Sequence, residues 1–99
     1  MTYSIIWEFR IVAAQRPRFE AVYAADGDWA KLFGQSHGYH GTQLLKCADE
    51  QGRYVTIDTW DSRDAFLAFR REHAEAYAGL DRDCEPLCVS EKPLGGFIN

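Results

Sequence analysis

The first segment of the chain alternates its side chains in a way that is typical of a β-strand near the centre of a sheet. Alternation divides residues 3–12, YSIIWEFRIV, between a first face of Tyr3, Ile5, Trp7, Phe9 and Ile11 and a second face of Ser4, Ile6, Glu8, Arg10 and Val12. Both faces carry apolar side chains. We therefore expect the apolar side chains on both faces of this strand to be buried against other parts of the protein or a partner subunit.

Apolar residues then recur at helical spacing in two stretches, which are Phe19, Val22 and Tyr23, and later Trp29, Leu32 and Phe33. Pro17 fits the first turn of a helix, because the N–H that proline lacks would have no partner there. We predict a first helix over about residues 16–25. Asp28 can cap a second, shorter helix that ends at Gly34.

The middle of the chain predicts a hairpin followed by a long helix. Residues 41–48 and 53–60 are rich in strand-forming side chains and flank the polar turn sequence ADEQG. Asp61 or Ser62 caps the helix that follows. Its buried stripe is formed by Phe66, Phe69, His73, Tyr77 and Leu80.

A last strand is predicted near residues 86–92, bracketed by prolines, which favour a sheet edge because proline cannot donate a hydrogen bond. The order is therefore β-α-β-β-α-β, the α+β, ferredoxin-like arrangement in which a four-stranded antiparallel sheet carries its helices on one face. We expect a single domain over residues 1–99. Ile6 and Val12 on the second face of the first strand predict a homodimer in which two sheets face each other.

The charge and composition of the chain restrict the partners it is expected to bind and the cellular compartment in which it is expected to be found. The formal net charge of −4 opposes binding to nucleic acid and to anionic membrane surfaces. The N-terminal apolar run contains Glu8 and Arg10 and has no small-residue cleavage site, so we expect a cytoplasmic protein. The three cysteines, Cys47, Cys84 and Cys88, are then expected to remain free thiols.

Four segments of the chain resemble the antibiotic-biosynthesis-monooxygenase-like (ABM) family of dimeric α/β-barrel proteins. They are IIWEFRI, FEAVYAADGDWAKLF, GYHGTQLLK and YVTIDTWDSRDAFLAF, and the run TW-x-S-x-x-AF in the last segment is the most family-like. The resemblance implies a pocket between the helices and the sheet of each protomer. Some members use this pocket for cofactor-independent oxygenation of phenolic or quinol-type substrates, and a haem-degrading branch uses it for haem.

The haem-degrading branch departs from this chain at two positions. It uses an asparagine on the first strand, approximately where Trp7 stands, and a histidine late in the second helix, where this chain has Tyr77 or Gly79. His73 lies about a turn and a half too early to replace that histidine. Haem binding is therefore the weakest of the functions that the resemblance implies.

His73 and Arg70 are the candidate catalytic residues. The imidazole of His73 could take or orient a hydroxyl proton near neutral pH, and Arg70 could stabilise a phenolate or a superoxide-like anion. The candidate substrate-binding residues are Trp7, Phe9, Trp29, Phe33, Asp58, Trp60, Phe69 and Tyr77. Each has a plainer alternative, because aromatic side chains also fill cores, a histidine can bond to the backbone and an arginine can lie in solvent.

Asp58 alternates with Trp60 and is expected on the same side of its strand. A buried carboxylate is costly unless it is paired, so either a cation such as Arg10 or Arg70 lies near Asp58, or Asp58 is exposed. His37 and His40 form an H-x-x-H pair that lacks a third ligand at suitable spacing. No phosphate-binding, dinucleotide-binding or nucleophile-elbow motif occurs. We therefore expect neither a metal nor a cofactor.

Two functions remain open. The first is a cofactor-independent monooxygenase that acts on a small electron-rich aromatic or quinol-type substrate, with His73 as the base. The second is a non-catalytic dimer that binds a small ligand or a partner protein, which the lack of an obvious acid–base pair favours. An open pocket lined by these aromatic residues with His73 inside would favour the first, and a fully packed interior would favour the second.

Overall fold

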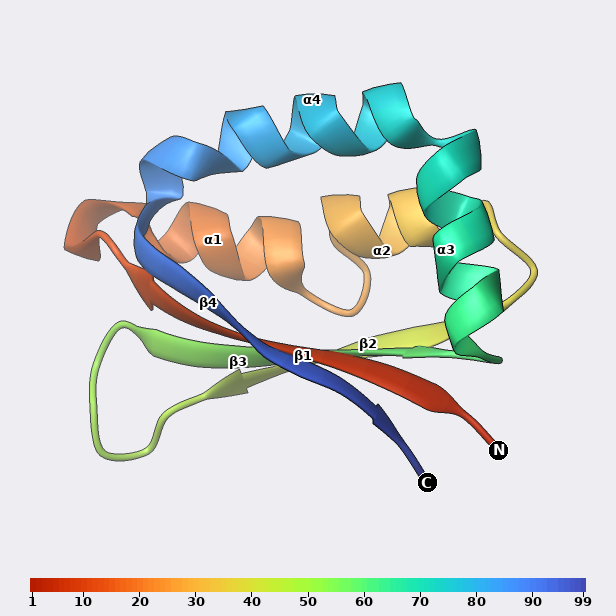
Figure 1. Ribbon diagram of the computed structural model, residues 1–99. Coiled ribbons are helices and arrows are strands. Elements are labelled where there is room, and N and C mark those ends of the chain that lie inside the picture. The colour runs from red at the N-terminus through yellow and green to blue at the C-terminus, as the bar shows by residue number, and fades with distance from the viewer.

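The computed structural model describes all residues, 1–99, and has a sheet on one side and all of its helices on the other (Figure 1). The strands are β1 (Tyr3–Ile11), β2 (Tyr39–Lys46), β3 (Arg53–Trp60) and β4 (Cys88–Ile98). The helices are α1 (Arg16–Tyr23), α2 (Asp28–Phe33), α3 (Arg63–Glu72) and α4 (Ala74–Cys84), with 3-10 turns η1 (Ala13–Gln15) and η2 (Glu85–Leu87). None of these helices has the length and apolar composition needed to cross a membrane.

The sheet has the strand order β2-β3-β1-β4, and every neighbouring pair is antiparallel. The predicted ferredoxin-like α+β fold is thereby confirmed, with β1 as a central strand and β4 at an edge. In the register of β1 with β3, Trp7 lies opposite Thr56 and Tyr3 lies opposite Trp60. Because both pairs lie on the same face, Trp7 and Trp60 point toward the helices, as the alternation predicts.

The hydrophobic core lies between this face and the helices. Its most completely buried large side chains are Phe19, Trp60 and Phe69, with exposed fractions of 0%, 0% and 1%. Aromatic rings make much of the contact: Trp60 packs against Phe33 and Phe69 with centroid distances of 5.5 and 5.2 Å. The core is therefore continuous from α1 to α3 over the width of the sheet.

The predicted long helix after the hairpin is in fact two helices, which corrects the prediction. The chain leaves helical geometry at His73 (φ −119°, ψ 31°), and α3 and α4 run in different directions on either side of it. The break has a packing reason: Phe69 of α3 contacts Trp60, whereas Tyr77 of α4 contacts Trp29 at a centroid distance of 5.0 Å. The two helices thereby pack against different rings of the core.

The structure also resolves which residue caps α3. The side chain of Ser62 accepts a hydrogen bond of 3.1 Å from the backbone N–H of Ala65, whereas Asp61 pairs with His40. Ser62 is therefore the N-cap.

Other boundaries also differ from the sequence-based prediction, including those of β2, which spans Tyr39–Lys46 rather than residues 41–48. The first helix ends at Tyr23, and the last strand continues to Ile98, which pairs with Tyr3. Strand β4 continues past Pro93 because it is an edge strand, and a bulge at Leu94 is followed by Gly95 at φ 125°. The C-terminal residues are thus part of the sheet of their own chain.

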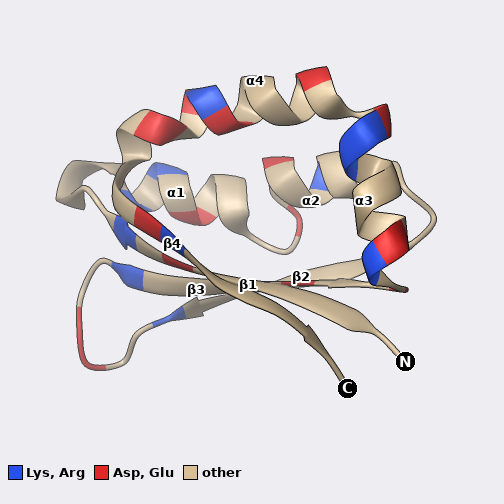
Figure 2. Cartoon of the chain, viewed as in Figure 1, with Lys and Arg blue, Asp and Glu red and all other residues tan.

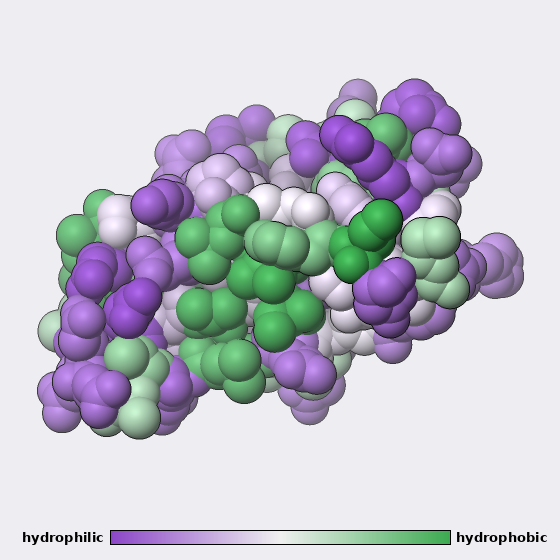
Figure 3. Space-filling view, turned by 60° about the horizontal axis from the view of Figure 1, so that its bottom comes forward, coloured by the Kyte–Doolittle hydropathy of each residue, from purple (hydrophilic) through white to green (hydrophobic).

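The face of the sheet that points away from the helices carries an apolar patch (Figure 3). Its members come from all four strands and are Ile6, Leu45, Val55, Ile57, Leu94 and Phe97. The exposed fractions of Leu45 and Phe97 are 48% and 51%. Charged residues of the sheet gather instead toward the end that carries the β2–β3 loop (Figure 2).

Candidate functional site

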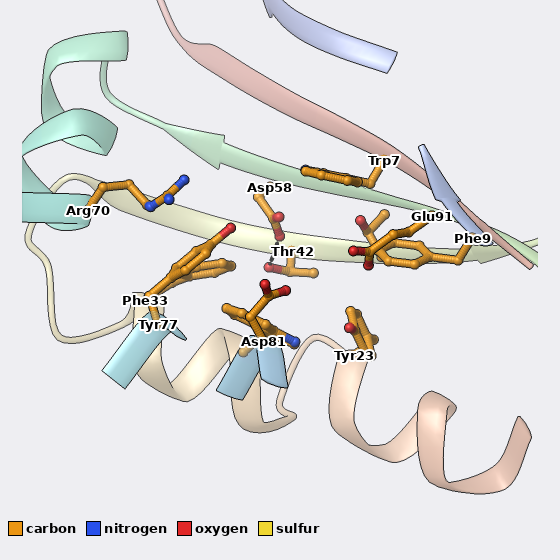
Figure 4. Close-up of a pocket in the computed structure, with 12 residues that line it drawn as sticks. Trp7, Phe9, Tyr23, Phe33, Thr42, Asp58, Arg70, Tyr77, Asp81 and Glu91 are labelled. Atoms are coloured by element: carbon orange, nitrogen blue, oxygen red, sulfur yellow. Dashed lines mark hydrogen bonds between the residues drawn. The ribbon is translucent and has the colours of Figure 1, made fainter. Parts of the chain in front are cut away.

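A pocket of about 260 Å³ lies between the sheet and the helices (Figure 4). Its walls combine aromatic rings with a few polar and charged groups. The lining residues are Trp7, Phe9, Tyr23, Trp29, Phe33, Thr42, Thr56, Asp58, Arg70, Tyr77, Asp81 and Glu91. The interior of the domain is therefore not fully packed by its own side chains.

The floor of the pocket follows from strand alternation and register. Trp7 and Phe9 of β1, and Thr56 and Asp58 of β3, lie at every second position of neighbouring strands and so share the helix-facing side. Thr42 of β2 is the direct partner of Asp58 on the other side of β3. The sheet therefore places the carboxyl group of Asp58 beside a hydroxyl group and among aromatic rings.

The carboxyl group of Asp58 has an unusual environment for a residue of a strand. Burial raises its pKa to about 6, although a hydrogen bond of 2.6 Å from the Thr42 hydroxyl opposes the rise. The hydroxyls of Tyr39 and Thr42 are also hydrogen-bonded to each other. A carboxylate that titrates near pH 6 can act as a general base at neutral pH.

The roof of the pocket contributes one cation. Arg70, in the last turn of α3, places its Cζ atom 3.9 Å from the ring centroid of Tyr77, in the first turn of α4. Burial raises the pKa of the Tyr77 hydroxyl, the charge of Arg70 lowers it, and the charges of Asp81, Asp58 and Glu91 raise it further. The guanidinium of Arg70 is thus held on an aromatic face and remains free of any ion pair.

Most of the candidate site residues line the pocket. They are Trp7, Phe9, Trp29, Phe33, Asp58, Arg70 and Tyr77. Trp60 and Phe69 do not line it and lie instead in the closed core, where their exposed fractions are 0% and 1%. The expected cation partner of Asp58 is not found: Arg10 pairs with Glu50, and Arg70 makes no ion pair.

His73, the candidate base, also lies outside the pocket lining. Its ring stacks on Phe69 at a centroid distance of 5.0 Å, and its backbone N–H bonds to the carbonyl of Phe69. The reason is the helix break at His73, which turns this position away from the line that joins Arg70 and Tyr77. Asp58 takes its place as the titratable group at the pocket floor.

Five lining residues were not among the candidates, namely Tyr23, Thr42, Thr56, Asp81 and Glu91. Alternation with Asp58 could have identified Thr56 from the sequence. Glu91 could not be identified in this way, because its position opposite Phe9 depends on the register of β4 against β1. Asp81 and Thr42 carry no pattern that sets them apart from solvated residues. Burial is the largest cause of a raised pKa at Glu91, and the charges of Asp81 and Glu85 add to it.

The histidine pair of the loop does not form a metal site. His40 pairs with Asp61, and His37 is exposed. No three His, Cys, Asp or Glu side chains of the chain come together as a set that could hold a metal ion. The three cysteines are free, as predicted.

Comparison with family models decides the family. The model described as antibiotic biosynthesis monooxygenase matches residues 2–78. The chain belongs to the ABM family. No curated protein sequence matched.

Solved structures of similar fold cover nearly the whole chain. SnoaB, a cofactor-independent oxygenase from Streptomyces nogalater, is 22% identical, with a TM-score of 0.80 over 99% of this chain and 92% of its own. Rv0793 from Mycobacterium tuberculosis is 17% identical, with a TM-score of 0.70 over 100% and 98%. A variant of MhuD with two manganese protoporphyrin IX groups per active site is 25% identical, with a TM-score of 0.72 over 98% and 93%. These three structures share the architecture of this chain.

Proposed function

We propose that this protein is a cofactor-independent monooxygenase that acts on a small electron-rich aromatic or quinol-type substrate in the pocket. The observation that carries the proposal is the carboxyl group of Asp58, with a pKa of about 6, on the floor of an aromatic-walled cavity. Membership of the ABM family and the shared fold of the cofactor-independent oxygenase SnoaB support the same chemistry.

The first step is proton transfer. Above pH 6 the carboxylate of Asp58 accepts a proton from an acidic hydroxyl group of the substrate or from the ring carbon that this hydroxyl activates. Arg70 then stabilises the negative charge that develops on the substrate oxygen, since its guanidinium faces the pocket and makes no ion pair. The substrate anion is the electron donor for the next step.

The second step uses dioxygen as the oxidant. The ring C–H position that is conjugated with the deprotonated hydroxyl group reacts with O₂ to give a quinone and H₂O. One oxygen atom becomes a C=O group of the product, and the other leaves as water with the hydrogens of the ring carbon and of the hydroxyl group. The substrate itself supplies all the electrons. The side chains of the pocket need only position the substrate and keep bulk water from the anion.

The aromatic walls suit a flat substrate. Trp7 and Phe9 lie side by side on the floor at a centroid distance of 6.2 Å, and Trp29 and Tyr77 meet edge to face on the roof. Planar aromatic ligands gain large contact areas against such surfaces. A cavity of about 260 Å³ is large enough for a bicyclic or small tricyclic compound.

The residues of the pocket do not fit haem. No histidine lines it, and three of its four charged groups, Asp58, Asp81 and Glu91, are carboxylates, which would repel the propionates of haem. The function proposed for this chain therefore follows the oxygenase SnoaB rather than the porphyrin-binding MhuD.

The protein is also proposed to act as a homodimer. The apolar patch on the open sheet face spans all four strands, and a second copy of the same sheet would cover it by a twofold-symmetric contact (Figure 3). The pocket lies on the opposite, helix-covered face, so each protomer would keep its own site.

Oxygen consumption with a panel of quinols and naphthols tests the proposed reaction. Asp58→Asn should lower kcat by about 10²-fold or more, because the amide cannot accept the proton. His73→Ala should leave kcat within about threefold, because His73 lies outside the pocket. A loss in His73→Ala with full activity in Asp58→Asn would make His73 the base. Ligand binding without oxygen uptake across the panel would instead identify a non-catalytic binding protein.

A further inference from the structure

One polar side chain of the pocket has no partner in the protein. Thr56 of β3 lines the pocket and is 4% exposed, which makes it the only buried side chain of the chain that is neither apolar nor aromatic. Its hydroxyl group forms no hydrogen bond within the chain. Its oxygen atom is not among the unpartnered polar atoms that the protein encloses completely, so it remains accessible from the pocket.

The neighbours of Thr56 in the sheet do not satisfy this hydroxyl group. Trp7 of β1 and Leu44 of β2 lie directly opposite Thr56 in the two ladders, and neither is hydrogen-bonded to it. The flanking residues on the same face of β3, Tyr54 and Asp58, are hydrogen-bonded to other side chains. The hydroxyl group of Thr56 is therefore left for a molecule in the pocket.

The residue type at this position points to a ligand. Valine has nearly the shape of threonine and is also enriched in strands, but it has no hydroxyl group that burial would leave without a partner. The floor of the pocket thus keeps a polar group at a place where an apolar one would suit the fold better. Because a hydroxyl group can both donate and accept a hydrogen bond, an oxygen atom of a bound molecule is a suitable partner.

Thr56 and Asp58 together form a polar row on β3, beside the aromatic row of Trp7 and Phe9 on β1. Side chains two residues apart on a strand leave the sheet roughly 7 Å apart. A flat ring that lies against the aromatic row can therefore direct one oxygen atom to Asp58 and another to Thr56. This spacing fits two oxygen atoms on non-adjacent ring carbons.

The proposed reaction restricts the position of the second oxygen atom further. A hydroxyl group that is deprotonated at Asp58 activates the ortho and para carbons of the ring, and one of these carbons must carry the hydrogen that is replaced. An oxygen atom in the meta position leaves all of these carbons free and donates electrons to the same carbons. The 1,3 arrangement thus suits both the polar row and the reaction with dioxygen.

We infer that the substrate is a 1,3-dihydroxy aromatic compound, with one hydroxyl group at Asp58 and the other hydrogen-bonded to the hydroxyl group of Thr56. The 1,3 arrangement rests on the proposed function, whereas the hydrogen bond to Thr56 is a matter of binding alone. Thr56 is thus a residue that determines specificity. With 1,3-dihydroxynaphthalene and O₂ the products are 2-hydroxy-1,4-naphthoquinone and H₂O, which contains the hydrogens of the ring carbon and of the hydroxyl group at Asp58.

A matched pair of ligands tests the role of Thr56 in binding. The probes are 1,3-dihydroxynaphthalene and 3-methyl-1-naphthol, which differ only in the group that would lie at Thr56. Isothermal titration calorimetry without oxygen measures their affinities in the absence of turnover. The wild-type protein should bind the dihydroxy compound about tenfold more tightly. Equal affinities, or no binding of either probe, would overturn the inference.

Three variants locate the preference at one hydroxyl group. Thr56→Val keeps the shape of the side chain and should reduce the preference for the dihydroxy compound to less than about twofold, whereas Thr56→Ser should retain most of it. Thr59→Val makes the same exchange on the other face of β3, where Thr59 is paired with Ser4 outside the pocket, and should leave the preference unchanged. An unchanged preference in Thr56→Val, or an equal loss in Thr59→Val, would contradict the assignment.

Urea unfolding separates a role in binding from a role in the fold. A hydroxyl group without a partner does not stabilise the free protein, so the unfolding midpoint of Thr56→Val should equal or exceed that of the wild-type protein. Saturating 1,3-dihydroxynaphthalene should raise the midpoint more for the wild-type protein, because a tighter ligand stabilises the folded state more. A lower midpoint for free Thr56→Val would make the hydroxyl group a structural one and overturn the inference.

Oxygen uptake with the same two compounds distinguishes the inference from the proposed reaction. A preference for the dihydroxy compound that depends on Thr56, without any uptake of oxygen, would overturn the reaction and leave the role of Thr56 in binding standing. Oxygen uptake with the same ratio of kcat/KM for the two compounds in the wild-type protein and in Thr56→Val would overturn the role of Thr56 and leave the reaction standing.

Discussion

The hydroxyl of Thr42 donates a 2.6 Å hydrogen bond to Oδ1 of Asp58, its direct partner across the β2–β3 ladder. A threonine hydroxyl has one proton, so the hydrogen bond between Tyr39 and Thr42 must be donated by Tyr39 while Asp58 is ionised. Both hydroxyls are therefore oriented toward the carboxylate. The hydrogen bond from Thr42 stabilises the charged form of Asp58, whereas burial stabilises the neutral form.

Removing that hydrogen bond should move the pH profile of the reaction. With Asp58 as the base, kcat/KM of the wild-type protein should rise with pH and reach half of its plateau near pH 6. Thr42→Val removes the donor and should shift this midpoint upward by up to about one pH unit. Thr42→Ser keeps the hydroxyl and should retain the wild-type midpoint. A profile that does not move in Thr42→Val would show that Asp58 does not control the rate.

Asp58 should also make folding stability depend on pH. Its pKa is raised from an ordinary value of 3.8 to about 6, so the folded state binds this proton more tightly than the unfolded state. Stability is then lost as the pH rises from 3.8 through 6, by up to about 3 kcal/mol. Asp58→Asn lacks this loss.

Urea unfolding at pH 4 and pH 8 measures this effect. The difference in unfolding free energy between Asp58→Asn and the wild-type protein should increase in favour of the variant by about 1–3 kcal/mol at the higher pH. Other titrating groups cancel in this comparison, since they are common to both proteins. A difference that is the same at both pH values would contradict the raised pKa.

The apolar patch on the open sheet face should be a subunit interface. Ile57 of β3 lies opposite Ile6 of β1 within this patch. Ile57→Glu would bury a charge there without a partner and should weaken dimerisation by about 100-fold or more, as measured by sedimentation velocity. Leu67→Glu, at a 40% exposed position of α3 on the helical side, should leave the dimer intact. A monomeric wild-type protein would refute the interface.

The core and the surface of α3 should differ sharply in their contributions to stability. Phe69 is 1% exposed and contacts Trp60 and Phe33, whereas Leu67 is 40% exposed. Phe69→Ala should lower the unfolding free energy by about 3–5 kcal/mol, and Leu67→Ala by less than about 1 kcal/mol, in urea titrations. Similar losses for both would mean that a partner subunit or ligand covers Leu67.

Local side-chain repeats predict the fold well because they report which face of each element is buried. The alternation in β1 places Trp7 and Phe9 correctly on the helical side, and the β2–β3 hairpin follows from its polar turn sequence. The break at His73 has no such signal, since neither glycine nor proline marks it. It arises from packing against rings that are distant in the sequence.

The pocket is predicted less completely for the same reason. Its aromatic walls belong to periodic faces, but its acidic groups come from β3, α4 and the edge strand β4. Whether Asp58, Asp81 and Glu91 meet in one place depends on tertiary contacts. The charge of a strand residue does not reveal its pKa, because burial by other elements sets that value.

The division of the roof into α3 and α4 has a consequence for how such a site can evolve. The helix α3 contributes Arg70 to the lining of the cavity and α4 contributes Tyr77 and Asp81, and the two helices are joined at a single non-helical residue, His73. A few substitutions around that joint would change the angle between the two helices and hence the size of molecule that fits. The strands beneath, with Asp58 and its hydroxyl neighbours, could stay the same. The same reaction could thereby act on larger or smaller compounds while the strand residues that carry it out remain unchanged.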